Sequence, residues 1–120
     1  MVKTYQDLKV YQKSYDLSLK LHHLTQDFPI QERYELGSQL RRSAVSVVLN
    51  IVEGYGRKTS PKEFKHFSRN SLGSSNEVRV ILQMTKDLGY LKQEHYDELA
   101  DEYEVLSKQL YRLMENWEKF

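Results

Sequence analysis

The chain has 120 residues, a formal net charge of +1 at pH 7 and 39% hydrophobic residues. This length suits a single domain, residues 1–120, that is large enough to bury one core without a metal or a disulfide. Cysteine is absent, which excludes disulfides, thiolate chemistry and cysteine-bound zinc and suits a reducing compartment.

Two further features of the composition set the class of protein. No apolar run approaches the roughly 18 residues of a membrane span, and the first residues lead into no apolar signal-peptide core. We therefore expect a cytoplasmic protein with no membrane contact. Only two prolines and five glycines occur, and this favours a mostly helical chain over a sheet protein.

The first helical pattern follows Thr4. Thr4 with Asp7 three residues later is typical of a helix start. Because Pro29 disfavours helical geometry at Phe28, the helix should end near Asp27. Its repeat at helical spacing consists of Leu8, Tyr11, Tyr15, Ser18 and His22, with Val10, Leu17, Leu21, Leu24 and Phe28 beside them.

The second helix begins near Gln31, or only at Ser38, and ends at Gly54 and Gly56. Its core face is Leu36, Leu40, Ala44, Val47, Val48, Ile51 and Tyr55. A second apolar face carries Tyr34, Val45, Leu49 and Val52. A helix that is apolar nearly all round is a buried one. In a chain this small, a neighbouring subunit is one way to cover the second face, so we expect a homo-oligomer.

The third helix has the sharpest start signal in the sequence. Ser60, Pro61 and Glu63 match a capping box with proline at the first helical position. The pattern predicts a helix from Pro61 to Leu88, closed by Gly89. Its core face is Phe64, Phe67, Ser71, Ser74, Ser75, Val78, Ile81, Leu82 and Thr85, and the small serines should let another helix approach closely.

The fourth helix has the cleanest repeat in the chain, stepping by three and four residues. This pattern predicts a helix antiparallel to the third across a short loop. Together the four patterns predict an all-α fold, an up-down-up-down antiparallel four-helix bundle. The fourth repeat consists of Tyr96, Leu99, Tyr103, Leu106, Leu110, Leu113 and Trp117.

A narrow polar strip on the second helix has two interpretations. Arg42, Ser46, Asn50 and Glu53 stack along the helix, so each can reach the next or a partner on the third helix. The structural interpretation is a buried network that fixes helix register, and the functional one is a ligand site. We favour the structural network, because buried charges must be paired.

The charges are unevenly spread. Residues 31–80 hold nine Lys or Arg against five Asp or Glu, whereas residues 81–120 hold five against nine. Such asymmetry indicates either an anion-binding middle or a basic and an acidic helix lying side by side. The densest basic run is a candidate phosphate-binding surface for RNA or DNA, without sequence specificity. It consists of Arg57, Lys58, Lys62, Lys65 and Arg69.

Several separated motifs resemble a known family. They are Asp7–Tyr11 (DLKVY), Phe28–Pro29, Gln39–Ser46 (QLRRSAVS), Asn50–Arg57 (NIVEGYGR) and Gly73–Glu77 (GSSNE). The chain resembles, from about residue 5 to residue 115, the four-helix bundle proteins encoded in intervening sequences of bacterial 23S ribosomal RNA genes. The resemblance implies an up-down-up-down bundle, often a ring-shaped homopentamer. It also implies similarity to the accessory bundle protein of diversity-generating retroelements, which binds nucleic acid.

The chain departs mildly from the family pattern at four places. The family usually has Trp at Tyr11, Ala at Ser43 and Val52, and Ala-Arg-Gly-Ser at Ser71–Ser74. The missing arginine at Leu72 removes one anion contact. The resemblance implies no reaction.

The residues themselves give little support for an enzyme. A ferritin-like di-iron site needs Glu-x-x-His on two helices and Glu on two more. Only Glu63 and His66 have this spacing, and they lie off the face that carries Phe64. His22 and His23 diverge by about 100° and cannot act as a pair. We therefore expect no metal, no cofactor, no catalytic residue and no small-molecule substrate.

Two functions follow from the sequence. The first is a non-enzymatic oligomeric bundle that binds nucleic acid through its basic surface. The alternative is a protein-protein interaction scaffold, in which the charge asymmetry serves only helix pairing and subunit contacts.

Overall fold

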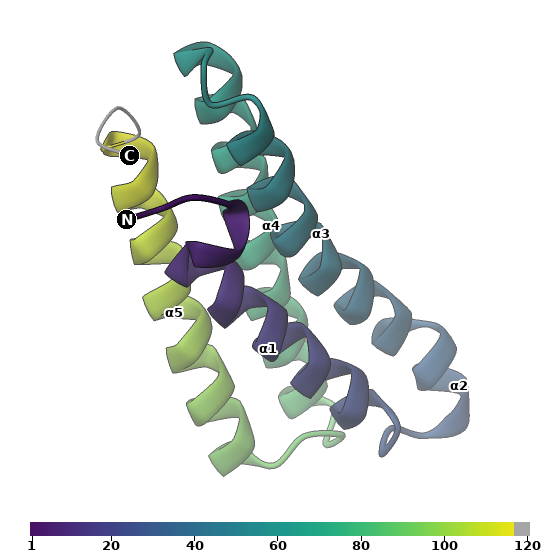
Figure 1. Ribbon diagram of the computed structural model, residues 1–120. Coiled ribbons are helices and arrows are strands. Elements are labelled where there is room, and N and C mark those ends of the chain that lie inside the picture. The colour runs from purple at the N-terminus through teal and green to yellow at the C-terminus, as the bar shows by residue number, and fades with distance from the viewer. Residues whose placement is uncertain (117–120) are drawn as a thin grey trace.

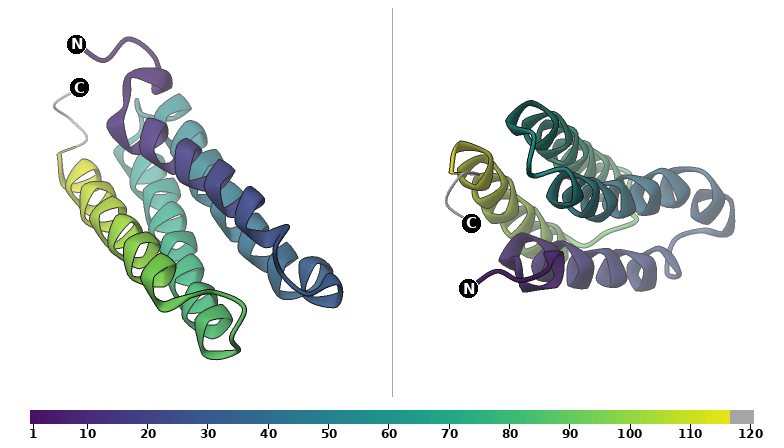
Figure 2. Two further views of the ribbon diagram at one scale, coloured as in Figure 1. Left: turned by 90° about the horizontal axis from the view of Figure 1, so that it is seen from below. Right: turned by 45° about the horizontal axis from the view of Figure 1, so that its top comes forward.

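The computed structural model describes residues 1–116, and within them four long helices pack as an antiparallel bundle (Figure 1). Each long helix runs opposite to the one before it, which confirms the expected all-α, up-down-up-down architecture (Figure 2). Trp117, expected on the last helix, lies outside the described residues. The elements are the 3-10 turn η1 (Tyr5–Asp7), α1 (Lys9–Thr25), α2 (Ile30–Tyr34), α3 (Leu36–Gly56), α4 (Pro61–Asp87) and α5 (Gln93–Glu115).

The N-terminal capping box belongs to η1 and not to α1. The Thr4 hydroxyl accepts a hydrogen bond from the Gln6 N–H at 3.2 Å, and the Asp7 carboxylate accepts one from the Thr4 N–H at 3.0 Å. Leu8 is then extended and buried in the core. Because this extended residue interrupts the helical hydrogen bonding, α1 begins only at Lys9.

The ambiguous stretch before α3 contains a short helix of its own. α2 ends at Tyr34, and Glu35 breaks the helix with φ −103° and ψ −90°. The sequence pattern placed Tyr34 on the second apolar face of the same helix as Val45 and Leu49. That placement is wrong, because the break at Glu35 separates Tyr34 from α3. Gly37 permits the tight corner, because a Cβ there would lie 2.9 Å from the carbonyl oxygen of Glu32.

The core lies between helices that are neighbours in the chain. α1 packs mainly against α3, α3 against α4, and α5 mainly against α4 (Figure 2). Most of the expected core stripes are buried, but Tyr15 is exposed and Phe67 is only half-buried, while Ser68 is buried beside it. The largest fully buried side chains are Tyr103, Phe28, Phe64, Leu17, Leu21, Leu40, Leu82, Leu106, Leu110, Val47 and Val78.

Serines on α4 connect it to both neighbouring helices. The Ser71 hydroxyl donates to the carbonyl oxygen of Val47 on α3 at 2.8 Å. The hydroxyls of Ser75 and Ser107 lie 2.7 Å apart and join α4 to α5. Because these side chains are small, the helix backbones can approach closely while the buried hydroxyls remain hydrogen-bonded.

Substitutions at Ser71 test this close packing. Ser71→Ala removes one hydrogen bond and should lower the free energy of unfolding by about 1 kcal/mol. Ser71→Leu inserts a large side chain between α3 and α4, and overpacking should cost roughly 1–3 kcal/mol or more. Urea unfolding of the two variants measures both effects. Equal stability of the two variants would contradict the packing described above.

Candidate nucleic-acid interface

The expected basic surface lies at the turn between α3 and α4 and on the first part of α4. Ser60 caps α4 by accepting a hydrogen bond from the Glu63 N–H at 3.3 Å, and Pro61 occupies the first turn. Lys62, Lys65 and Arg69 follow at intervals of three and four residues, so they share one face of the helix. Local capping at Ser60 therefore fixes where this face begins.

Arg57 is already occupied by two carboxylates. Its Nε lies 2.7 Å from Glu53 Oε1, and its Nη1 lies 2.9 Å from Glu63 Oε1. These hydrogen bonds raise the pKa of Arg57. The guanidinium also lies 5.2 Å from the centre of the Phe67 ring. Arg57 thus links the end of α3 to the start of α4. The sequence suggested a full capping box, but the Glu63 carboxylate pairs with Arg57, and only the Ser60 half of the box is formed in the described residues.

Lys58 is held by an aromatic neighbour. Its Nζ donates to the Tyr55 hydroxyl at 2.8 Å and lies 4.0 Å from the centre of that ring. Tyr55 itself is buried in the core, so its ring packs in the bundle and offers no platform for a base. Neither contact involves a carboxylate, and Lys58 forms no ion pair within residues 1–116.

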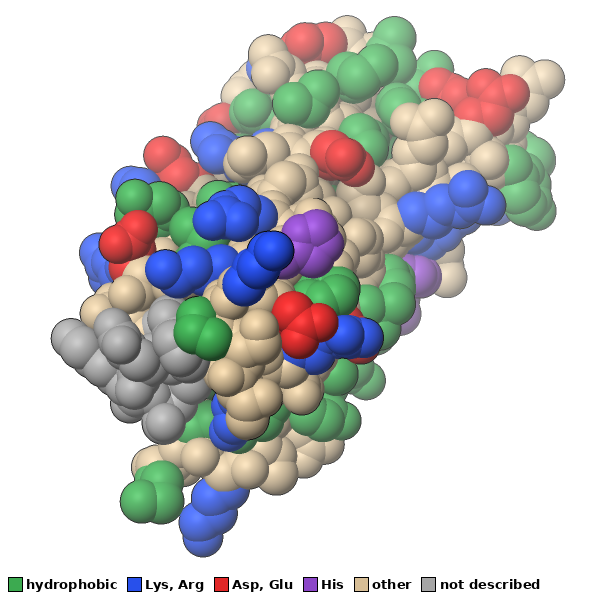
Figure 3. Space-filling view, turned by 90° about the horizontal axis from the view of Figure 1, so that it is seen from above, with side chains coloured by type: hydrophobic (Ala, Val, Ile, Leu, Met, Phe, Trp, Pro, Cys, Tyr) green, Lys and Arg blue, Asp and Glu red, His purple; other side chains and the backbone are tan. Residues whose placement is uncertain are grey.

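Lys62, Lys65 and Arg69 are the cations that the turn leaves available. Within residues 1–116 none of the three forms an ion pair. Lys62 and Arg69 are exposed, and Lys65 is half-buried. The neighbouring His66 is exposed, its Nε2 lies 3.4 Å from the Asn70 amide nitrogen, and its ring contacts Phe67 edge-on. Figure 3 shows the molecule from above, with several Lys and Arg side chains gathered beside a histidine and acidic side chains close to them.

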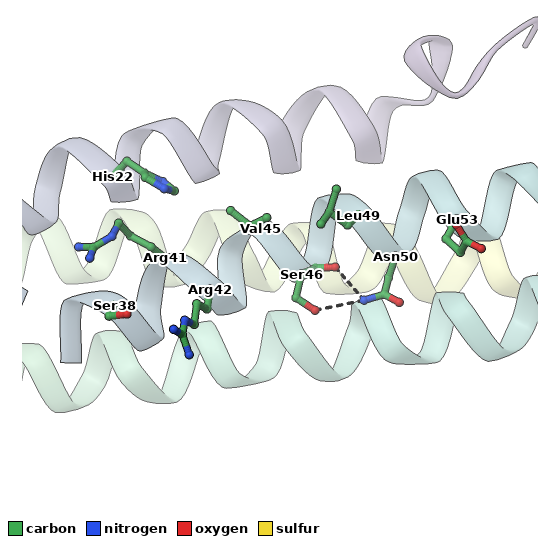
Figure 4. A pocket seen from close by; sticks show the side chains of 9 residues that line it. All are labelled: His22, Ser38, Arg41, Arg42, Val45, Ser46, Leu49, Asn50 and Glu53. Atoms are coloured by element: carbon green, nitrogen blue, oxygen red, sulfur yellow. Dashed lines mark hydrogen bonds between the residues drawn. The ribbon is translucent and has the colours of Figure 1, made fainter. Parts of the chain in front are cut away.

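The expected polar network on α3 is divided into separate parts (Figure 4). The Asn50 amide donates to the Ser46 hydroxyl at 3.1 Å, and Ser46 in turn lies 2.8 Å from the Ser74 hydroxyl on α4. Glu53 is exposed and pairs with Arg57. Arg42 is exposed and forms no hydrogen bond or ion pair within the described residues. The expectation that Arg42 and Glu53 are buried is therefore wrong, because this strip faces outward from the bundle.

The structural arginine is Arg41, which the sequence pattern did not select. Its Nη1 donates to the Thr25 hydroxyl at 2.8 Å, and its Nη2 donates to the carbonyl oxygen of Arg33 at 2.9 Å. These bonds join α3 to the end of α1 and to α2. Two consecutive residues of a helix point in directions about 100° apart, so Arg41 and Arg42 cannot face the same neighbours. Only the packing between helices shows which of the two is held against them.

The outer face of α3 is hollowed on both sides of Arg42. A hollow of about 680 Å³ lies over its middle and contains the exposed side chains of Val45 and Leu49. A second, of about 600 Å³, lies between α3 and α4 and contains the exposed Val80 and Met84. Both hollows therefore combine apolar side chains with polar rims. The first is lined by His22, Ser38, Arg41, Arg42, Val45, Ser46, Leu49, Asn50 and Glu53 (Figure 4).

Comparisons with known proteins place the chain in a family. The family model described as 23S rRNA-intervening sequence protein matches residues 6–112. The chain belongs to this family. The chain shares its fold with a solved structure from Bacteroides thetaiotaomicron. That structure is of a protein with unknown function from the S23 ribosomal protein family. The TM-score is 0.81 at 21% identity, and the match covers 89% of this chain and 96% of that chain. No curated protein matches.

Residues 1–116 contain neither a membrane-spanning helix nor a cluster of metal ligands. None of the helices in this range has both the length and the apolar character needed to cross a membrane. In residues 1–116, no group of three or more His, Cys, Asp or Glu side chains is arranged to hold a metal ion. Glu63 and His66, which have di-iron spacing in the sequence, bond instead to Arg57 and Asn70.

The two adjacent arginines give a matched pair of variants. Arg41→Met should lower the free energy of unfolding by about 2 kcal/mol, because two hydrogen bonds from a charged group are lost. Arg42→Met should leave the melting temperature nearly unchanged, and so should Glu53→Gln, because both side chains are exposed. Thermal unfolding followed by circular dichroism measures the difference. Destabilisation by Arg42→Met equal to that by Arg41→Met would contradict these positions.

Proposed function

We propose that this protein is a non-enzymatic, homo-oligomeric nucleic-acid-binding protein of the cytoplasm. Its phosphate-binding surface is formed by Lys62, Lys65 and Arg69, with Lys58 and Arg57 at its edge. One observation carries the proposal: three cations share a face of α4, and none of them has a carboxylate partner within residues 1–116. Binding phosphates neutralises such a surface and releases counterions from the nucleic acid.

The kind of recognition follows from the side chains present. Lysine and arginine on an exposed helix face contact phosphate oxygens, and such contacts carry no sequence information. Tyr55, an aromatic side chain next to this surface, is buried in the core and offers no open face to a base. The proposed binding is therefore non-specific, and it extends to both RNA and DNA.

The proposed assembly rests on apolar side chains that the bundle leaves exposed. Leu49 on α3 is 61% exposed and Val80 on α4 is 57% exposed, with Val45 and Met84 beside them. A symmetric oligomer would cover them, and a closed ring such as a pentamer would repeat the basic surface around its axis. A ring of this kind would hold several phosphates at once and strengthen a weak individual contact.

The same apolar side chains favour a second candidate function, a protein-protein interaction scaffold. In that case Leu49 and Val80 would bind a partner protein, and the cations of α4 would remain solvated. Salt dependence separates the two functions, because binding to phosphates weakens steeply as salt is added. A scaffold that binds through apolar side chains shows no such dependence.

The first test concerns the basic surface. Binding of the wild-type protein to duplex DNA should have a log-log salt slope of about −0.9 for each phosphate neutralised. Replacing Lys62, Lys65 and Arg69 together by Gln should make that slope less negative by roughly 2.7 and weaken binding equally for all sequences. Fluorescence anisotropy at several salt concentrations provides the measurement.

A second triple variant, with one change at the N-cap of α5 and two on α5, is the control. Lys92, Lys108 and Arg112 are also exposed, and their replacement by Gln removes the same charge from another part of the molecule. This variant should bind with nearly the wild-type slope. If the wild-type protein does not bind at low salt, or if the two triple variants weaken binding equally, the nucleic-acid proposal is wrong.

The second test concerns assembly. Light scattering should show an oligomer at micromolar concentration, and Leu49→Glu combined with Val80→Glu should convert it to a monomer, because buried charges oppose association. Leu19→Glu is the control, since Leu19 is similarly exposed but lies on α1. A monomeric wild-type protein would overturn this part of the proposal.

A further inference from the structure

A small hollow lies at the corner where α1, α2 and α3 meet. Its volume is about 270 Å³, and it shares His22 and Arg41 with the larger hollow on the outer face of α3. α2 lies at the opposite end of α3 from the turn into α4, so this corner is remote from the basic surface of α4 (Figure 1). The corner hollow is lined by His22, Thr25, Gln26, Arg33, Tyr34 and Arg41.

Two guanidinium groups line the hollow, and neutral oxygens hold both of them. Arg33 Nε donates to the carbonyl oxygen of Phe28 at 3.0 Å. Arg41 donates to the Thr25 hydroxyl and to the carbonyl oxygen of Arg33. A guanidinium has five N–H groups, so further donors remain on each arginine. The hydrogen bonds thus fix the positions of the two guanidinium groups before any ligand binds, and they leave the positive charges unpaired.

No carboxylate balances these charges in the described residues. Neither Arg33 nor Arg41 forms an ion pair within residues 1–116. Glu32, the carboxylate on α2, lies near Tyr90, whose pKa is raised by desolvation and further by this neighbour. Two fixed and unneutralised guanidinium groups lining one hollow favour an anion, and planar forks of N–H donors match the oxygens of a phosphate.

His22 adds a further polar group on the α1 side (Figure 4). Its Nδ1 lies 2.8 Å from the carbonyl oxygen of Ser18. A carbonyl oxygen only accepts, so this geometry assigns the proton to Nδ1 and leaves Nε2 without it in the neutral ring. His22 is therefore oriented by its own helix, and its second ring nitrogen is available to a ligand hydroxyl.

Tyr34 supplies an aromatic surface at the same hollow. It is 77% exposed, the largest exposed fraction of any tyrosine in residues 1–116. An exposed tyrosine ring next to arginines is the combination that proteins use to stack a nucleobase while holding its phosphate.

We propose that this corner binds a nucleotide. Arg33 and Arg41 hold the phosphate, and the base stacks on Tyr34. The same chemistry recognises a free nucleotide and one nucleotide of a single strand. The site does not depend on the basic surface of α4, because the two share no residue and lie at opposite ends of α3.

The test is an NMR titration that follows the Nε–H signals of arginine with three small probes. Adenosine 5′-monophosphate carries a phosphate and a base, ribose 5-phosphate lacks the base, and adenosine lacks the phosphate. The monophosphate should bind most tightly and shift the signals of Arg33 and Arg41. Equal shifts with inorganic phosphate, or shifts confined to Arg57 and Arg69, would overturn the proposal.

Two variants separate the phosphate from the base. Tyr34→Leu should weaken adenosine 5′-monophosphate about tenfold, the order expected for loss of one stacked base, and leave ribose 5-phosphate unchanged. Tyr34→Phe should restore binding. Arg33→Gln should weaken both phosphates and not adenosine. The matched controls are Tyr111→Leu and Arg112→Gln on α5, which are also exposed. Unchanged affinity in Tyr34→Leu or in Arg33→Gln would refute the site.

A final comparison distinguishes the two sources of the nucleotide. If a trinucleotide binds much more tightly than the monophosphate, and Tyr34→Leu weakens it, the corner takes single-stranded nucleic acid. If the two bind equally, it takes the free nucleotide. The variant with Lys62, Lys65 and Arg69 replaced by Gln should bind the monophosphate normally, so failure of the α4 surface and failure of this site give different results.

Discussion

The close contact between α3 and α4 is the constraint on which the rest of the bundle depends. Small side chains lie along this contact, and at its end a Cβ on Gly54 would lie 3.2 Å from the Cβ of Phe67. Hydrogen bonds from Ser71 to Val47 and between Ser46 and Ser74 cross the same contact between the two helices. Because the two helices meet through these small residues, their long charged side chains are left on the outer faces. The same geometry brings Arg57 to Glu63 at the turn.

Carboxylate pairing then decides which cations are available to a ligand. Arg57 lies between two carboxylates and serves to join α3 to α4. Lys62, Lys65 and Arg69 on α4 have no such partner in the described residues. The acidic residues of α5 form no ion pair with this stretch, although the uneven charge along the chain made pairing between helices a reasonable alternative. Ion pairs close to the turn therefore decide the roles within this basic run: Arg57 is structural, and the unpaired cations of α4 are candidates for binding.

The fold was predictable from the sequence, whereas the candidate sites were predictable only in part. Helical periodicity and the signals at Ser60 and Gly89 depend on local backbone geometry, so they identified the four long helices. Which of two adjacent polar residues turns inward depends on packing between helices, and periodicity could not show that Arg41 is tied down while Arg42 is exposed. The short helix ending at Tyr34 was not separated from α3, because Glu35 breaks the helix with no glycine or proline at that position to signal it. The corner hollow lies beside that break, with Tyr34 in its lining.

The central claim is that the unpaired cations of α4 are the nucleic-acid surface, and acetylation footprinting tests it most directly. Lysine reactivity is measured by mass spectrometry with and without saturating duplex DNA at low salt. The claim predicts that Lys62 and Lys65 are protected by the duplex, whereas Lys92 and Lys108, which are exposed beside or on α5, react as before. Uniform protection of all four lysines, or protection confined to Lys92 and Lys108, would contradict it.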